Sequence, residues 1–139
     1  MRPRVLLVRE WDTQMGGSGC CGRLGGLDSG LCEVDPFPRA RAGMERMGVV
    51  YRALHEALGD ERIELTVVDP RNTVALPPMI YRDARRRRGM GRRDALRQVR
   101  RGVGTGAVVV DGKVLHWGTI AEDPDSVVAA VLDELAASP

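Results

Sequence analysis

The chain has 139 residues, of which 43% are hydrophobic and 29% are charged, and its formal net charge is +2. This length suits one globular domain with a core of its own, so we predict a single domain over residues 1–139. This near-neutral net charge excludes the class of proteins that are strongly basic or strongly acidic along the whole chain. The first apolar run, residues 5–8, is too short for a secretory signal or a membrane span. We therefore expect a cytoplasmic protein with no membrane association.

The first elements in chain order are a strand and a long loop. Residues 4–8, RVLLV, form a short apolar run that is typical of a buried strand. Residues 10–38 follow neither a strand nor a helix period and are rich in glycine, which predicts a Gly- and Cys-rich loop. Loops of this length inside a domain are usually functional or disordered, so a site is first sought here.

A helix and a second strand are expected next. Apolar residues recur along one helical face at a 3-4-3-4 spacing: Met44, Met47, Tyr51, Leu54 and Leu58. Gly59 is a natural stop for this helix. Residues 63–69, IELTVVD, then predict a strand that Pro70 closes.

The remaining chain predicts a helical insertion, a hairpin and a last helix. Residues 72–101 read as an arginine-rich, mostly helical insertion, broken near Gly89 and Gly91. Residues 106–118 predict two strands joined by a turn at Asp111-Gly112. An Asp-Pro pair at 123–124 predicts the start of the last helix. Its apolar face is Val127, Val128, Val131, Leu132 and Leu135.

The predicted order is therefore β-α-β-α-β-β-α, an α/β fold with a four-stranded mixed sheet and flanking helices. This is the order of the thioredoxin fold, and the chain resembles the thioredoxin-like superfamily over nearly its whole length. The strongest local similarity is in residues 104–135, GTGAVVVDGKVLHWGTIAEDPDSVVAAVLDEL. This stretch resembles the corresponding end of the thioredoxin-like two-iron ferredoxins.

All three cysteines of the chain, Cys20, Cys21 and Cys32, lie in the glycine-rich loop. Cytoplasmic thiols are kept reduced, so an odd number of cysteines indicates redox chemistry or metal binding more than a structural disulfide. Burial as small apolar side chains is the alternative. A disulfide between the adjacent pair would be strained, and one to Cys32 less so. Cationic neighbours, Arg23 and the arginines at 39 and 41, would lower a thiol pKa.

The resemblance implies what these cysteines would do. The two-iron ferredoxins carry two cysteines about a dozen residues apart before the first helix, where Cys20 or Cys21 stands here with Cys32. Their second cysteine pair is missing, since residues 67–79, VVDPRNTVALPPM, hold neither Cys nor His. A two-iron cluster normally takes four protein ligands, so the fourth would come from a carboxylate, a second subunit or a small thiol. Ordinary disulfide reduction is also disfavoured, because the chain has no CxxC motif and no proline within residues 104–106.

Three functions follow. The first is a cysteine-centred redox or electron-transfer protein, with Cys20, Cys21 and Cys32 as thiol redox groups or as ligands of a non-standard iron–sulfur cluster. The second is a carrier of a thiophilic metal or metalloid ion, as the similarity of the vicinal pair to thioredoxin-fold arsenic metallochaperones implies. The third is a non-catalytic interaction scaffold that docks partners through the arginine-rich helix. No carboxylate pair is spaced for acid–base catalysis, so a thiol oxidoreductase is the one enzyme that we consider.

Ten arginines lie within residues 82–101. They favour docking of an acidic protein or a redox partner, and the alternative is a solvated helix face. The candidate partner-binding residues are Arg85, Arg86, Arg87, Arg88, Arg92 and Arg93. Nucleic acid is not expected, because no aromatic residue interleaves with the arginines. A homodimer would be consistent with the ferredoxin resemblance. His55 and His116 are not expected to be ligands.

Overall fold

The computed structural model describes residues 1–9, 38–118 and 124–137, with the side chains of 38–40 left aside. The elements in chain order are β1 (Arg4–Val8), α1 (Pro38–Arg62), β2 (Glu64–Val68), α2 (Leu76–Arg86), α3 (Arg92–Gly102), β3 (Val108–Val110), β4 (Lys113–His116) and α4 (Pro124–Ala137). The predicted α/β class with a mixed four-stranded sheet is confirmed. The predicted loop lies outside the described residues except for Pro38, which begins α1.

The sheet has the strand order β2-β1-β3-β4. Strand β1 pairs in parallel with β2, with Val5 opposite Leu65, and pairs antiparallel with β3, with Val5 opposite Val110. Strands β3 and β4 form the antiparallel edge pair. Every residue of β1 from Val5 to Val8 is at most 1% exposed, as expected for a strand whose two faces are both covered.

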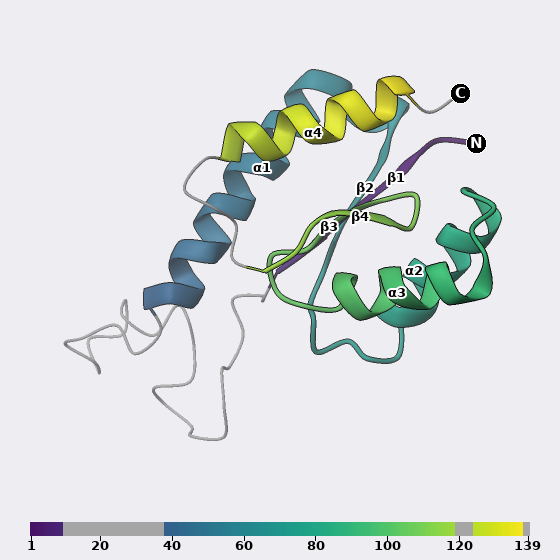
Figure 1. Cartoon of the computed structure of the whole chain (residues 1–139). Helices are drawn as coiled ribbons and strands as arrows, with labels where there is room; N and C mark the ends of the chain where they lie inside the picture. The colour runs from purple at the N-terminus through teal and green to yellow at the C-terminus, as the bar shows by residue number, and fades with distance from the viewer. Residues whose placement is uncertain (10–37, 119–123, 138–139) are drawn as a thin grey trace.

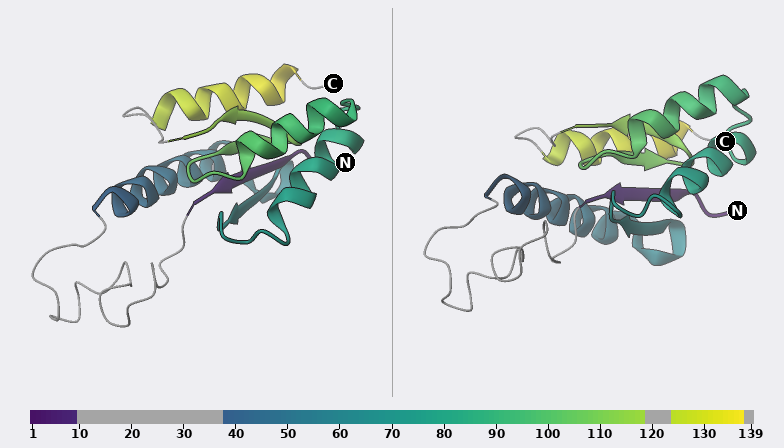
Figure 2. Two further views of the ribbon diagram at one scale, coloured as in Figure 1. Left: turned by 60° about the horizontal axis from the view of Figure 1, so that its bottom comes forward. Right: turned by 90° about the horizontal axis from the view of Figure 1, so that it is seen from below.

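Helices cover both faces of the sheet (Figures 1 and 2). Successive side chains of a strand point to opposite faces, so β1 supplies Val5 and Leu7 to one hydrophobic cluster and Leu6 and Val8 to another. The first cluster includes side chains of α1 and α4, and the second includes side chains of α2. The core is therefore two layers that share the central strands.

The buried face of α1 differs in one position from the predicted stripe. Met47 and Leu54 are buried as predicted, but Val50 is fully buried and Tyr51 is 37% exposed. Adjacent positions on a helix differ by about 100° in direction, so only one of the two can face the core. The tyrosine ring instead stacks on His55, with ring centroids 6.1 Å apart.

The predicted boundaries after α1 are largely confirmed. Gly59 leaves the helical conformation, with φ 66° and ψ 167°. The arginine-rich insertion forms two helices, separated around Gly89, whose φ is 63°. The turn between β3 and β4 has positive φ at both Asp111 and Gly112, which is the geometry expected of a two-residue hairpin.

The last helix begins at Pro124, as predicted, and buries Val127 and Val131. The cap predicted at position 123 lies outside the described residues. Within the described ranges, no helix has the length and apolar character needed to cross a bilayer.

Candidate functional site

The candidate cysteines Cys20, Cys21 and Cys32 lie outside the described residues. The two points where their segment joins the fold are described. It begins after Arg9, whose backbone N–H donates to the carbonyl of Val68 at 3.0 Å, and it ends where α1 starts. The chain next to β1 is also fixed on its other side, since the N–H of Gly106 donates to the Val8 carbonyl at 2.8 Å. The segment therefore leaves from a rigid end of the central strand.

A hollow of about 440 Å³ joins the end of β1 to the first half of α1. We call it the β1–α1 hollow, and its lining residues are Arg9, Arg41, Met44, Glu45, Arg46, Gly48, Val49 and Arg52. Four of these carry a guanidinium and one carries a carboxylate. The place where the cysteine segment begins is therefore strongly cationic.

This charge would act on any thiol that lies near the hollow. A thiol is reactive, and binds metals, as the thiolate, and nearby cations or a helix N-terminus lower its pKa. Arg9 is the most suitable donor, because its Nε is buried and finds no hydrogen-bond partner among the described residues. Of the cations named from sequence, Arg41 does line the hollow, and the side chains at 23 and 39 are not described.

Sequence reasoning did not identify Arg9 or Arg52 as part of this surface. Arg9 could have been found, because it directly follows the predicted strand and so must stand at the start of the loop. Arg52 could not, since its approach to Arg9 depends on how α1 crosses the end of β1. Both also line a second hollow of about 490 Å³ that continues towards Leu65 and Thr66 of β2.

The described residues supply no alternative metal centre. No three His, Cys, Asp or Glu side chains within the described ranges are close enough together to hold an ion. His55 is exposed on α1, and its Nδ1 lies 3.2 Å from Asp60 Oδ1. His116 Nδ1 lies 3.1 Å from the Gly106 carbonyl oxygen. Each histidine thus has a local partner.

The six arginines proposed for partner binding are not equivalent. Arg87 and Arg88 make ion pairs within the protein, with Asp111 at 3.1 Å and Glu134 at 2.5 Å respectively. Arg85 donates to the Met90 carbonyl, which closes the turn after α2. Arg85 is exposed, as are the remaining three, Arg86, Arg92 and Arg93. The structure therefore divides the run into structural arginines and solvent-facing ones.

A buried ion network at the start of β1 explains the structural role of Arg87. Asp83 of α2 is 3% exposed and is the buried charged residue of the described core. Arg4 of β1 donates to its Oδ2 at 3.0 Å, and Arg87 Nε lies 3.4 Å from its Oδ1. Burial lowers the pKa of Arg4, but hydrogen bonds and charges from Glu64 and Asp83 outweigh this and raise it. The network ties α2 to the sheet at the start of β1, whereas the cysteine segment leaves from the strand's other end.

Comparisons of the chain with models of protein families, with curated protein sequences and with solved structures found no significant match. What the protein does must therefore be inferred from its own residues and their arrangement.

Proposed function

We propose that this protein is a thioredoxin-like, cysteine-centred redox or electron-transfer protein that uses Cys20, Cys21 and Cys32. The observation that carries this proposal is the cationic β1–α1 hollow. The segment that holds every cysteine of the chain begins and ends beside it. Guanidinium groups favour the thiolate of a cysteine that comes close to them, and the thiolate is the form that transfers electrons or binds iron.

The arrangement of the described elements supports the thioredoxin-like assignment. A parallel β1–β2 pair joined through α1, an antiparallel β3–β4 hairpin and a final helix give the order that the resemblance implies. A fold alone does not fix a function, so the proposal depends on the cysteines and the charges around them.

The simplest reaction is reversible disulfide formation. Two cysteine thiols lose two protons and two electrons as their sulfur–sulfur bond forms, and an oxidised disulfide partner takes both and becomes two thiols. A bond from Cys20 or Cys21 to Cys32 leaves the other member of the pair as a spare thiol. Coordination of iron by the three thiolates, with a fourth ligand from elsewhere, is the other form of the same proposal.

Anaerobic purification of the full chain tests which form is present. A visible absorption band with bound iron and sulfide would identify the cluster form. A colourless sample whose thiols are lost in pairs under mild oxidation and regained under reduction would identify the disulfide form. Stoichiometric binding of a thiophilic ion, without any redox response, would show the carrier function in place of this proposal.

Single serine variants at positions 20, 21 and 32 separate the site from a scaffold. The proposal expects at least two of the three variants to lose the redox response or the cluster while keeping the far-ultraviolet circular dichroism of the parent protein. If all three variants behave as the parent does, the cysteines have no such role and the scaffold function remains.

A further inference from the structure

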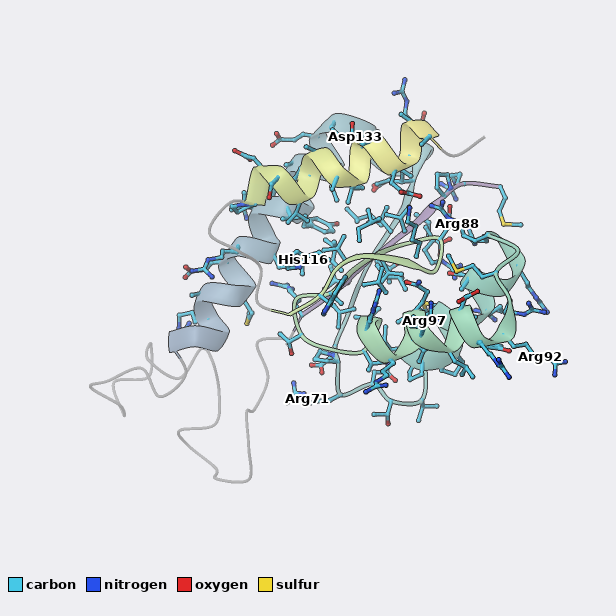
Figure 3. The ribbon with its side chains drawn as sticks, in the orientation of Figure 1. Arg71, Arg88, Arg92, Arg97, His116 and Asp133 are labelled. Carbon is cyan, nitrogen blue, oxygen red and sulfur yellow. The ribbon has the colours of Figure 1, made fainter. Side chains whose placement is uncertain are left out.

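A third hollow lined by arginines, of about 620 Å³, lies between the end of α3 and the end of β4. We call it the α3–β4 hollow, and its lining residues are Arg97, Arg100, Arg101, Val103, Gly104, Thr105, Trp117 and Gly118. Three arginines and one large aromatic residue line it, and no carboxylate is among the lining residues. Arg97 and His116, the residue before the tryptophan, are labelled in Figure 3.

Trp117 is the distinctive residue of this hollow. Its side chain is 53% exposed, although tryptophan is one of the largest apolar residues. The guanidinium carbon of Arg101 lies 4.8 Å from the ring centroid, a cation–π contact. An exposed indole held beside cations is a suitable platform for a planar group that also carries negative charge.

The positive charge continues from the hollow along α3. Residues three or four apart lie on one face of a helix, so Arg93, Arg97 and Arg100 or Arg101 form one stripe that ends at Trp117. The helix contains five arginines and a single acidic residue, Asp94. Its pair with Arg97, at 3.2 Å, is exposed on both sides and neutralises little.

The helix dipole gives a structural reason for the last two arginines of α3, but not for the other residues of the hollow. Cations near a helix C-terminus are favoured by the helix dipole, which accounts for Arg100 and Arg101. It does not account for Arg97 in the middle of the helix, nor for an exposed tryptophan across the hollow. Neither Arg100 nor Arg101 has an ion-pair partner among the residues that the structure describes.

We propose that the α3–β4 hollow and the arginine stripe of α3 bind single-stranded nucleic acid. Phosphates would follow the arginines, and one base would stack on the exposed part of the Trp117 ring, as in sequence-tolerant single-strand binding. The linear sequence disfavours this ligand because no aromatic residue lies among the arginines. The fold removes that objection, since the hairpin brings position 117 against position 101.

An acidic protein is the competing occupant, and its carboxylates would engage the arginines but not the Trp117 ring. Carboxylates could pair with the arginines, but an aspartate or glutamate side chain has no aromatic ring to stack on the indole. A nucleotide supplies both the ring, in its base, and the negative charge, in its phosphate. This proposal does not depend on the cysteines and stands or falls separately from the redox function.

The test uses fluorescence anisotropy of a labelled twelve-nucleotide oligouridylate with the full-length protein. Binding should weaken with salt, as counterion release requires. W117A should weaken binding about tenfold, the usual scale for loss of one stacked base, and W117F should restore most of it. R100Q should lower the slope of log K against log salt by about 0.7, and the control R62Q, on α1, should leave it unchanged.

Three results would overturn the proposal. The first is equal affinity of W117A and the parent protein for the labelled strand, when W117A has the circular dichroism of the parent. The second is displacement of the labelled strand by polyglutamate as effectively as by unlabelled oligouridylate at equal charge, which would identify an acidic-protein surface. Absence of measurable binding at low salt would also contradict the proposal.

Discussion

At the scale of single residues, Asp83 is the buried charged residue of the described part of the chain, and it lies at the centre of an ion network. Its carboxylate is 5% exposed and faces Arg4 and Arg87, whose side chains are 16% and 12% exposed. Removing one member of a buried set leaves the others without compensation, and this cost usually exceeds what the intact pair contributes. The residue is therefore expected to be sensitive to substitutions that preserve its shape.

We predict that D83N lowers the free energy of unfolding by about 2 to 3 kcal/mol, because two partly buried guanidinium groups lose the most buried of their counter-ions; Arg4 then keeps Glu64, and Arg87 keeps Asp111. Urea denaturation followed by circular dichroism measures this change. The matched control is D94N, since Asp94 pairs with Arg97 on the surface, and it should change stability by less than about 0.5 kcal/mol. Equal effects of the two substitutions would show that the network contributes no more than a surface pair.

This network could not be predicted from the sequence. Asp83 stands within an arginine run, which suggests a solvated helix face. Its burial follows from the way α2 lies across the start of β1, where Arg4 reaches the carboxylate and also pairs with Glu64 of the neighbouring strand β2. The cysteines and Arg41 were accessible to sequence reasoning, because a glycine-rich segment without periodicity indicates a loop and Arg41 follows it near the start of the predicted helix.

At the scale of elements, the hairpin and α2 pack with almost no space between them. A Cβ atom added at Gly112 would lie 2.7 Å from the backbone carbonyl carbon of Asp83, and closer still to the backbone of Ala84. Gly112 also has φ 81°, where side chains other than hydrogen are strained. The turn therefore requires glycine for two independent reasons.

We predict that G112A destabilises the protein by about 3 kcal/mol or more, because backbone atoms of α2 cannot move aside as a side chain can. The control is G89A, since Gly89 also has positive φ but no atom within 4 Å of an added Cβ. Backbone strain alone should cost about 1 kcal/mol there. Thermal denaturation of the two variants distinguishes them, and similar losses would argue against the close contact.

Helix α4 is tied to the rest of the fold by Glu134. Lys113 Nζ of β4 lies 2.6 Å from its Oε2, and Arg88 lies 2.5 Å from its Oε1. Burial raises the pKa of Glu134, but the hydrogen bonds and charges of Lys113 and Arg88 outweigh it and hold the pKa below the ordinary value of 4.5. The ionised form is therefore the one that the folded state favours.

A lowered carboxyl pKa stabilises the fold above the unfolded value, and this stabilisation is lost as the pH falls through the folded value. We predict that E134Q is less stable than the parent protein at pH 7 and that the difference shrinks below pH 4.5. Thermal unfolding over a pH series measures it, with the exposed E56Q as control. A difference that stays constant with pH would show that packing, and not charge, is responsible.

Element boundaries were the part of the fold that the sequence predicts best. Gly59, Gly89 and the Asp111–Gly112 turn each mark a real change of direction, because positive φ is a local requirement that glycine meets. The choice between Val50 and Tyr51 on α1 was less accessible. It depends on which side of the helix packs against the sheet and α4, and tertiary packing decides this.

At the scale of the whole molecule, the two hydrophobic clusters share their central strands. Alternate residues of β3 divide in the same way as those of β1, with Val108 and Val110 in one cluster and Val109 in the other. Neither cluster can lose its packing without exposing strands that support the other. The described elements are therefore expected to unfold together.

We predict one cooperative unfolding transition. Far-ultraviolet circular dichroism and the fluorescence of Trp117, in a variant whose other tryptophan is replaced (W11F), should give the same urea midpoint. The circular dichroism reports helices on both faces, and Trp117 reports the end of β4. Two separate midpoints would show that the layers unfold independently and would contradict a single domain.

The central claim concerns how the cysteines act together, and a count of accessible thiols tests it most directly. Protein purified without oxygen should show either bound iron or a pair of thiols that disappears on mild oxidation and returns on reduction. We predict this paired, reversible behaviour and its loss in the variant C32S. Three independent thiols in every state, with no bound iron, would contradict the account.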